Sequence, residues 1–141
     1  MKYEKDDLRQ RTKDFALRVV KLYGQLPSSS IARTLGHQLL RFATSVGANY
    51  REAYRARSTA EFLSKLGECL KELEETAYWL ELLAESGTIS AKRLTLLIDE
   101  TSQLTAIFTS IAKKVRARAL NFIPHTSSFI LYLCPLSKRA I

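Results

Sequence analysis

Residues 39–83 constrain the fold most strongly, because apolar side chains recur through them at intervals of three and four residues. This spacing places the apolar side chains on one face of an α-helix. Ser58-Thr59-Ala60-Glu61 has the form of a capping box, which predicts that one helix ends near Arg57 and that the next begins just after it. Two amphipathic helices joined by so short a turn are expected to lie antiparallel and to bury their apolar faces together.

The flanking sequence predicts two more helices, one over about residues 6–25 and one over about residues 90–118. We therefore predict a single all-α domain, an up-down-up-down four-helix bundle over residues 6–118, followed by a short irregular C-terminal tail over residues 119–141. The predicted core positions are Leu8, Phe15, Val19, Leu22, Tyr23, Leu26, Ile31, Leu35, Leu39, Phe42, Val46, Tyr50, Phe62, Leu66, Cys69, Leu70, Leu73, Ala77, Leu80, Leu83, Leu94, Leu97, Ile98, Leu104, Phe108, Ile111 and Val115.

Several functional classes are excluded by what the sequence lacks. It has no apolar run long enough to cross a membrane, and its first residues have no apolar signal-peptide core. We therefore expect a cytoplasmic protein in which Cys69 and Cys134 are reduced thiols. His37 and His125 have no acidic neighbours in a metal-binding pattern, and no catalytic or nucleotide-binding motif is visible. The chain is accordingly predicted to be non-enzymatic and to bind no cofactor.

Charge is unevenly distributed along a chain whose net charge is +8. Residues 61–85 contain seven glutamates and two lysines, so the predicted third helix is acidic. The second helix carries a basic stripe on the side opposite its apolar face. This stripe consists of Arg33, His37, Arg41, Arg51 and Arg55.

The antiparallel arrangement also gathers basic residues at one end of the bundle, because the first helix starts where the second and fourth helices end. This basic pole is expected to collect Arg9, Arg11, Lys13, Arg51, Arg55, Arg57, Lys113, Lys114, Arg116 and Arg118. Such a cluster attracts phosphate, which points to RNA or DNA, and Tyr50 and Tyr54 lie near enough to stack on bases. The predicted nucleic-acid-binding residues are Arg41, Arg51, Arg55, Arg57, Lys113, Lys114, Arg116 and Arg118.

The same charge pattern is also compatible with ordinary structural roles. A charged face opposite an apolar one is commonly no more than a solvated face. The acidic helix can form ion pairs with basic helices of its own or a neighbouring subunit, and cations at the end of the fourth helix match its macrodipole. An acidic protein partner is a further alternative. Among single polar residues, Asn49 is expected to be a buried amide hydrogen-bonded between helices, and Glu52 to pair with Arg51 or Arg55.

Three stretches of the sequence resemble a known family: RFATSVGANYREA (41–53), RSTAEF (57–62) and LKELEE (70–75). They are similar to the four-helix-bundle family that is also called the intervening-sequence protein family, after members encoded within insertions in bacterial large-subunit ribosomal RNA genes. Its pattern is an Arg-x-Ala-x-Ser helix, an Asn-Ile-x-Glu-Gly turn, an Arg-x-Ser step, Glu-Phe and a Glu-x-Glu helix. The matching residues are Arg41, Ser45, Asn49, Glu52, Arg57, Ser58, Glu61 and Phe62.

Two positions depart from the family pattern within a resemblance that covers about residues 8–116. Tyr50 replaces the common Ile, and Ala53 replaces the common Gly, which suggests that the second helix continues without a bend. The resemblance implies a homo-oligomer, with pentamers known in the family, and no catalytic site. A related bundle, the accessory variability determinant of diversity-generating retroelements, is a basic pentamer that works with a reverse transcriptase and RNA. By that analogy, several basic poles around one axis would strengthen phosphate binding through multivalency.

Two functional hypotheses of different classes follow. The first is an oligomeric accessory protein that binds RNA or other nucleic acid through the basic pole. The second is a protein-assembly module in which the acidic third helix pairs with the basic second helix of a neighbouring copy, without any nucleic acid.

Overall fold

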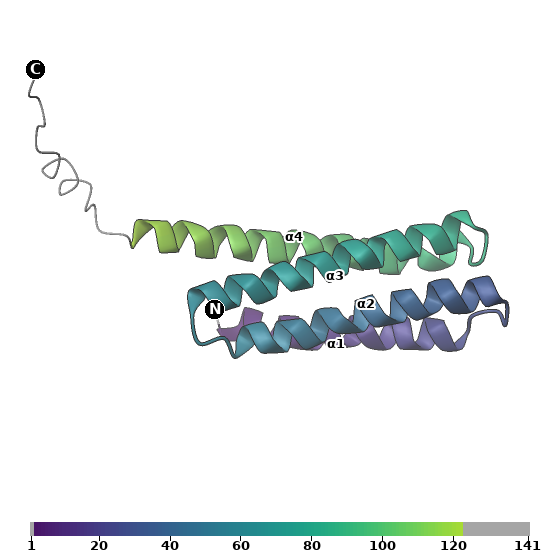
Figure 1. Cartoon of the computed structure of the whole chain (residues 1–141), viewed down its shortest axis with the longest axis horizontal. Helices are drawn as coiled ribbons and strands as arrows, with labels where there is room; N and C mark the ends of the chain where they lie inside the picture. Colours follow the sequence, from purple (N-terminus) through teal and green to yellow (C-terminus); the bar gives the residue numbers. More distant parts are fainter. Residues whose placement is uncertain (1, 123–141) are drawn as a thin grey trace, which may run out of the picture.

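The computed structural model describes residues 2–122, with side chains from Asp7 onward. Its four helices are α1 (Lys2–Gly24), α2 (Ser30–Tyr54), α3 (Thr59–Glu85) and α4 (Ala91–Asn121). They run alternately in opposite directions, with α1 and α2 below α3 and α4 in the view of Figure 1. The predicted all-α four-helix bundle is confirmed, and residues 123–141 of the predicted tail lie outside the described residues.

The helix ends follow the capping signals in the sequence. Of the three consecutive serines at residues 28–30, Ser29 is the N-cap of α2, and its hydroxyl accepts a hydrogen bond from the Ala32 N–H at 3.1 Å. Ser58 caps α3 in the same way by accepting from the Glu61 N–H at 3.1 Å. Gly87 follows the end of α3 with φ at 71°, a left-handed conformation that glycine adopts without strain.

The ends of α2 and α4 differ from the prediction in opposite directions. α2 stops at Tyr54 and not near Arg57, because the chain must turn before the Ser58 cap. It runs through Ala53 as one helix, as the loss of the family glycine suggested. α4 continues to Asn121, three residues beyond the expected end at residue 118, since no helix breaker occurs before Pro124.

Most predicted apolar positions form a single buried core, with Phe15, Leu66 and Phe108 among its fully enclosed side chains. Three predicted core residues are instead exposed: Ile31 at 60%, Ile98 at 40%, and Ala77. Ile31 lies in the first turn of α2, where no neighbouring helix covers it.

Three buried threonines were missed because their hydroxyls suggest a surface position. Thr12, Thr76 and Thr101 are each at most 2% exposed. Each hydroxyl donates to a carbonyl four residues earlier in its own helix, at 2.7 or 2.8 Å. Because that bond satisfies the hydroxyl locally, the methyl group can pack in the core without leaving a buried donor unpaired.

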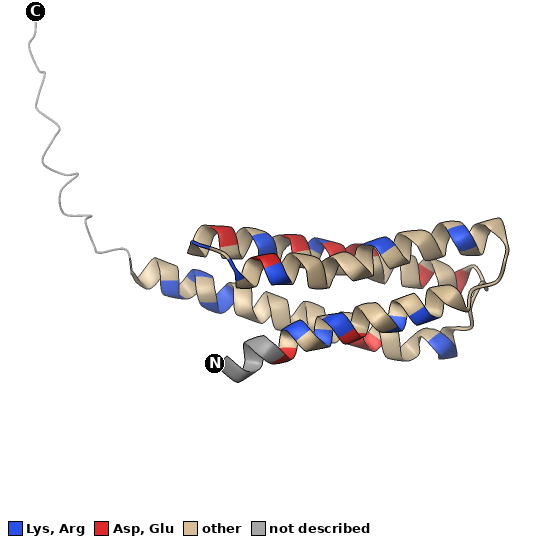
Figure 2. Ribbon diagram, turned by 90° about the horizontal axis from the view of Figure 1, so that it is seen from below, with Lys and Arg blue, Asp and Glu red and all other residues tan. Residues whose placement is uncertain are grey.

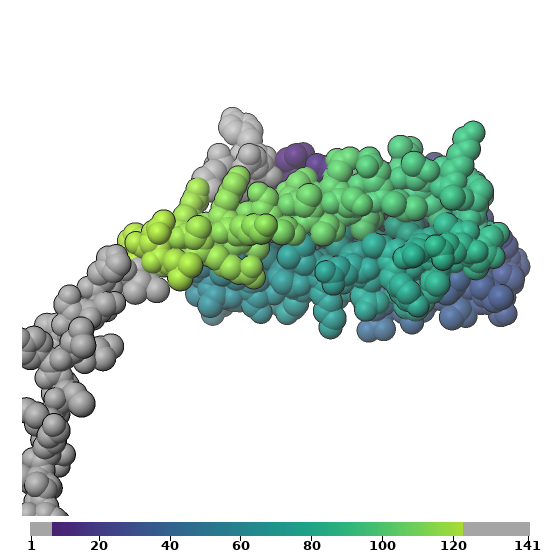
Figure 3. Space-filling model, turned by 90° about the horizontal axis from the view of Figure 1, so that it is seen from above, coloured from purple at the N-terminus to yellow at the C-terminus, as the bar shows by residue number. Residues whose placement is uncertain are grey.

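The four helices do not pack equally on one another. α2 packs closely on α1 and α3, and α3 packs on α4, whereas α1 and α4 touch only lightly. A groove of about 400 Å³ lies between α1 and α4. Arg11 crosses it, with Nε 2.7 Å from Glu100 Oε1 and Nη2 2.7 Å from Gln103 Oε1. The last turns of α4 extend beyond the rest of the bundle (Figures 1 and 3).

The core assignment is testable with two leucines of opposite burial. Leu66→Ala should lower the free energy of unfolding by about 2–5 kcal/mol, because Leu66 is 0% exposed and its removal leaves a cavity. Leu96→Ala should change it by no more than about 0.5 kcal/mol, because Leu96 is 73% exposed. Urea denaturation followed by circular dichroism measures both values. Equal losses in the two variants would contradict this packing.

Candidate nucleic-acid interface

The end of the bundle that holds the start of α1, the turn between α2 and α3 and the end of α4 is rich in Lys and Arg (Figure 2). α1 contributes Arg9, the end of α2 and the following turn contribute Arg51, Arg55 and Arg57, and the last turns of α4 contribute four more cations. Those of α4 are Lys113, Lys114, Arg116 and Arg118. The basic pole predicted from the topology is therefore present in the folded chain.

Contacts between α1 and α2 shape the first part of this pole. The Arg9 guanidinium lies 4.8 Å from the centroid of the Tyr54 ring, a distance typical of a cation–π interaction. A hollow of about 210 Å³ opens beside this pair, and we call it the basic hollow. It is lined by Arg9, Arg51, Glu52, Tyr54 and Arg55.

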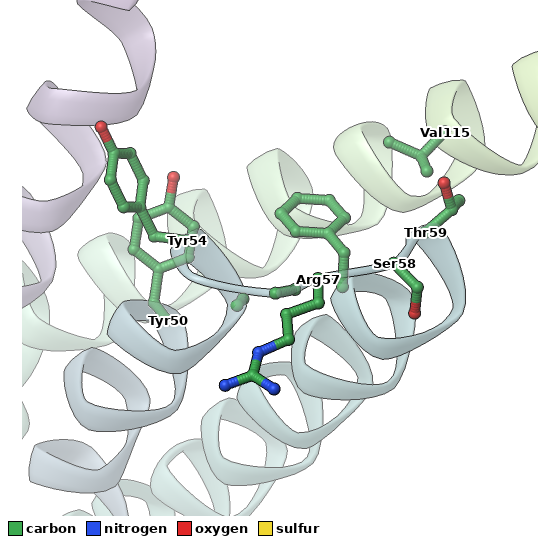
Figure 4. Close-up of a pocket in the computed structure, with 9 residues that line it drawn as sticks. Tyr50, Tyr54, Arg57, Ser58, Thr59 and Val115 are labelled. Carbon is green, nitrogen blue, oxygen red and sulfur yellow. The ribbon is translucent and has the colours of Figure 1, made fainter.

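A second hollow, of about 370 Å³, lies on the turn between α2 and α3, and we call it the turn hollow. Figure 4 shows the Tyr50 and Tyr54 rings on the α2 side, Ser58 and Thr59 at the start of α3, and Val115 on α4. The lining residues are Tyr50, Ala53, Tyr54, Ala56, Arg57, Ser58, Thr59, Phe62 and Val115. Because Tyr54 lines both hollows, it forms the wall between a basic space and an aromatic one.

The overhang of α4 extends the same surface. A shallow space of about 500 Å³ lies under it, lined by Thr59, Val115, Arg118, Ala119 and Phe122. Thr59 and Val115 also line the turn hollow, so the two spaces are adjacent. Phe122 is 89% exposed at the rim.

Two carboxylates lie at this end of the bundle, Glu52 in the lining of the basic hollow and Glu61 in the first turn of α3. Glu52 accepts from Lys65 Nζ at 2.7 Å, and not from Arg51 or Arg55 as predicted, because Lys65 on α3 is the cation that reaches it. The hydrogen bonds from Lys65 to Glu52 and Glu68 raise the pKa of Lys65 to about 12. Glu61 accepts from the Arg57 backbone N–H at 2.9 Å. Glu52 is thus tied to α3, whereas Glu61 keeps its negative charge beside the turn and offsets part of the arginine charge there.

Seven of the eight predicted nucleic-acid-binding residues lie at the basic pole, and Arg41 does not. Arg41 lies in the middle of α2, with its guanidinium 5.3 Å from the centroid of the Phe42 ring. Its charge acts on Glu72, whose pKa is raised by burial and lowered in part by Lys71 and Arg41. Arg41 is thus an exposed cation on the side of the bundle, away from the pole.

Two further residues that were expected at the pole have other roles. The Arg11 side chain is bound to Glu100, and this hydrogen bond raises the pKa of Arg11. Tyr50 is only 2% exposed and packs on Phe108 with ring centroids 5.3 Å apart. Tyr50 is therefore a core residue that closes the floor of the turn hollow, and Tyr54, at 41% exposure, is the accessible tyrosine.

The later residues of the family motif build the corner between α2 and α3, whereas Arg41 and Ser45 lie in the middle of α2. The Ser45 hydroxyl donates to the Arg41 carbonyl at 2.9 Å, Ser58 and Glu61 cap the turn, and Phe62 lines the turn hollow. Asn49 is half-buried and has no interhelical hydrogen bond among the described residues, so the predicted buried amide was wrong. Most of these residues therefore shape the pole without supplying its charge.

No cluster of three or more His, Cys, Asp or Glu side chains that suits a metal ion occurs within the described part of the chain. His37 is exposed, while His125 and Cys134 lie outside the described residues. Cys69 is a buried, free thiol whose Sγ lies 3.6 Å from the Val46 carbonyl oxygen. None of the helices described here is long and apolar enough to cross a membrane.

The fold and the pole define a small helical-bundle protein whose accessible chemistry is concentrated positive charge. A model of the 23S rRNA-intervening sequence protein family matches residues 4–110, and the chain belongs to that family. It is also similar to a crystal structure from Bacteroides thetaiotaomicron, a protein with unknown function from the S23 ribosomal protein family. The TM-score is 0.73 at 36% sequence identity, over 77% of this chain and 97% of that one. No curated protein matches the chain.

The reactivity of the buried Cys69 thiol can be used to test the packing of the core between α2 and α3. Desolvation raises the pKa of Cys69 to about 12, so the folded thiol stays protonated at pH values where an unfolded thiol ionises. A Cys134→Ser variant leaves Cys69 as the one cysteine of the sequence. At about pH 8 its thiol should react with a thiol reagent far more slowly in buffer than in concentrated urea. The buried thiol's contribution to stability should fall as the pH rises above about 9, the ordinary value. Equal labelling rates in both solutions would contradict its burial.

Proposed function

We propose that this protein is a non-enzymatic, homo-oligomeric accessory factor of the cytoplasm that binds RNA, or nucleic acid more generally, through the phosphates at its basic pole. The observation that carries the proposal is the gathering of cations at one end of the bundle: Arg9, Arg51, Arg55 and Arg57 line two hollows that share Tyr54, and the cations of the end of α4 lie at the same end. A cluster of arginines is suited to phosphate because each guanidinium presents several donors in a fixed plane.

Oligomerisation would strengthen this binding without any new contact. Each copy carries one basic pole, and copies arranged around an axis present several poles to one polyanion. Pentamers occur among relatives of this family, and a reverse transcriptase that works on RNA is a candidate protein partner by the same resemblance. The names of the family and of the similar structure refer to ribosomal RNA and to ribosomal proteins, which makes structured RNA the first probe to use.

Charge reversal at the pole tests the proposal. The variant Arg51→Glu, Arg55→Glu, Arg57→Glu should bind structured RNA much more weakly than the wild type, and its log–log salt slope should be shallower by about two to three, because each lost phosphate contact removes about 0.7–0.9. Fluorescence anisotropy across a salt series measures both quantities. Light scattering on the same samples reports the oligomeric state.

The matched control reverses three exposed cations at the opposite end of the bundle: Arg33→Glu, Lys92→Glu and Arg93→Glu. It changes the net charge by the same amount and should retain most of the wild-type affinity and slope. If both triple variants lose affinity equally, binding follows net charge and not the pole. If the wild type ignores RNA even at low salt, the proposed function is wrong.

A second candidate function, a protein-assembly module, is favoured by an aromatic cluster on α2 and α3. Phe42 stacks on Trp79 with ring centroids 6.5 Å apart, and Tyr78 lies edge-on to Trp79 and is 51% exposed. The Trp79 Nε1–H is buried and has no acceptor among the described residues. Exposed aromatic side chains of this kind are enriched at protein interfaces.

On this second candidate, Tyr78→Glu should lower the mass measured by light scattering to that of one chain, because it places a charge in an apolar contact. Thr34→Glu, an exposed position near the start of α2, is the control and should leave the mass unchanged. If the Tyr78 variant keeps the wild-type mass, the aromatic cluster is not part of an assembly surface.

A further inference from the structure

We infer that the turn hollow holds one unpaired nucleotide, with its base against Tyr54 and its phosphates on the arginines beside it. This inference rests on the proposed function and narrows it to nucleic acid with exposed bases. It follows from the position of Tyr54, which lines both the aromatic turn hollow and the basic hollow.

The Tyr54 ring is held in place by its contact with Arg9. It is in the last turn of α2, and the Arg9 guanidinium lies 4.8 Å from its ring centroid. Its side chain is nevertheless 41% exposed, and it lines both hollows. A ring that is already positioned loses little freedom when a base stacks on it, which favours binding.

The turn hollow has the surfaces that a nucleobase uses. Its walls include the rings of Tyr54 and the half-buried Phe62, which match the flat apolar faces of a base, and the buried Tyr50 ring closes its floor. Its other side carries the Thr59 hydroxyl, which can donate to or accept from the polar edge of a base, and the Ser58 hydroxyl, which accepts from the Glu61 N–H and has its own proton left to donate. A volume of about 370 Å³ lies in the range of pockets that hold small ligands.

Arginines lie near enough to contact the phosphates on the 5′ and the 3′ side of such a base. The basic hollow, with Arg9, Arg51 and Arg55, lies directly across Tyr54. Arg57 is on the turn itself, and its side chain extends outward (Figure 4). The site therefore combines stacking with charge, which is the combination that binds single-stranded nucleic acid.

A paired base cannot enter this hollow, because its faces are covered by its neighbours in the stack and its edge by its partner. Seating it would require unstacking and unpairing, which a loop, bulge or strand end does not require. The basic pole alone would attract a duplex and a single strand alike, so preference for unpaired nucleotides is the specific expectation.

The test compares two RNAs of equal length at one ionic strength: a hairpin with an unpaired purine loop and a fully paired duplex. The wild type should bind the hairpin more tightly. Tyr54→Leu, which keeps apolar bulk but removes the ring, should weaken hairpin binding by about 5- to 150-fold, the range for loss of one stacked base. It should leave duplex binding nearly unchanged, and Tyr54→Phe, which keeps the ring, should bind the hairpin much as the wild type does.

A fluorescent purine in the loop gives a second readout, which reports stacking of the base and not overall affinity. Its emission should be quenched when the wild type or Tyr54→Phe binds, because stacking on an aromatic ring quenches it, and not when Tyr54→Leu binds. Equal wild-type affinity for the two RNAs, or equal losses on both in Tyr54→Leu, would overturn this inference and leave phosphate binding at the pole intact. Absence of binding to either RNA would overturn the proposed function together with it.

Discussion

The close pairing of α2 with α3 is the constraint on which the rest of the structure depends. These two helices form the most extensive contact in the bundle, joined by a turn whose length is fixed by the Ser58 cap. The Cys69 thiol and the Phe42–Trp79 stack lie within that contact. With α2 and α3 antiparallel, α1 packs on α2 and α4 packs on α3 around one shared core. This arrangement brings the end of α4 to the α2–α3 turn.

The interior of this bundle holds few groups that can do chemistry. Its buried polar side chains, among the described residues, are Thr12, Thr76 and Thr101, and each is bound to its own helix. The sides of the bundle carry scattered charges, several of them paired, such as Lys65 with Glu52. The accessible positive charge is concentrated at the end of the bundle that holds the α2–α3 turn. The hollows at this end expose the arginines that line them.

Helix positions and the basic pole could be predicted from the sequence because both depend on local signals and on topology. Ser29, Ser58 and Gly87 mark helix ends by chemistry that acts within a few residues. The individual partners could not be predicted, because they depend on the rotation and axial offset of each helix against its neighbours. That is why Glu52 meets Lys65, Arg11 meets Glu100, and Tyr50 faces Phe108. The hollows around Tyr54 likewise exist only once three helices have met.

The basic pole also has a thermodynamic consequence for the fold itself. In the unfolded chain Arg9, Arg51 and Arg118 are far apart, whereas folding brings them to one end of the bundle, where like charges repel. Mobile ions screen that repulsion, so the native state gains stability as ionic strength rises. A polyanion that binds only the gathered cations is linked to folding by mass action, so its binding and the stability of the bundle rise together.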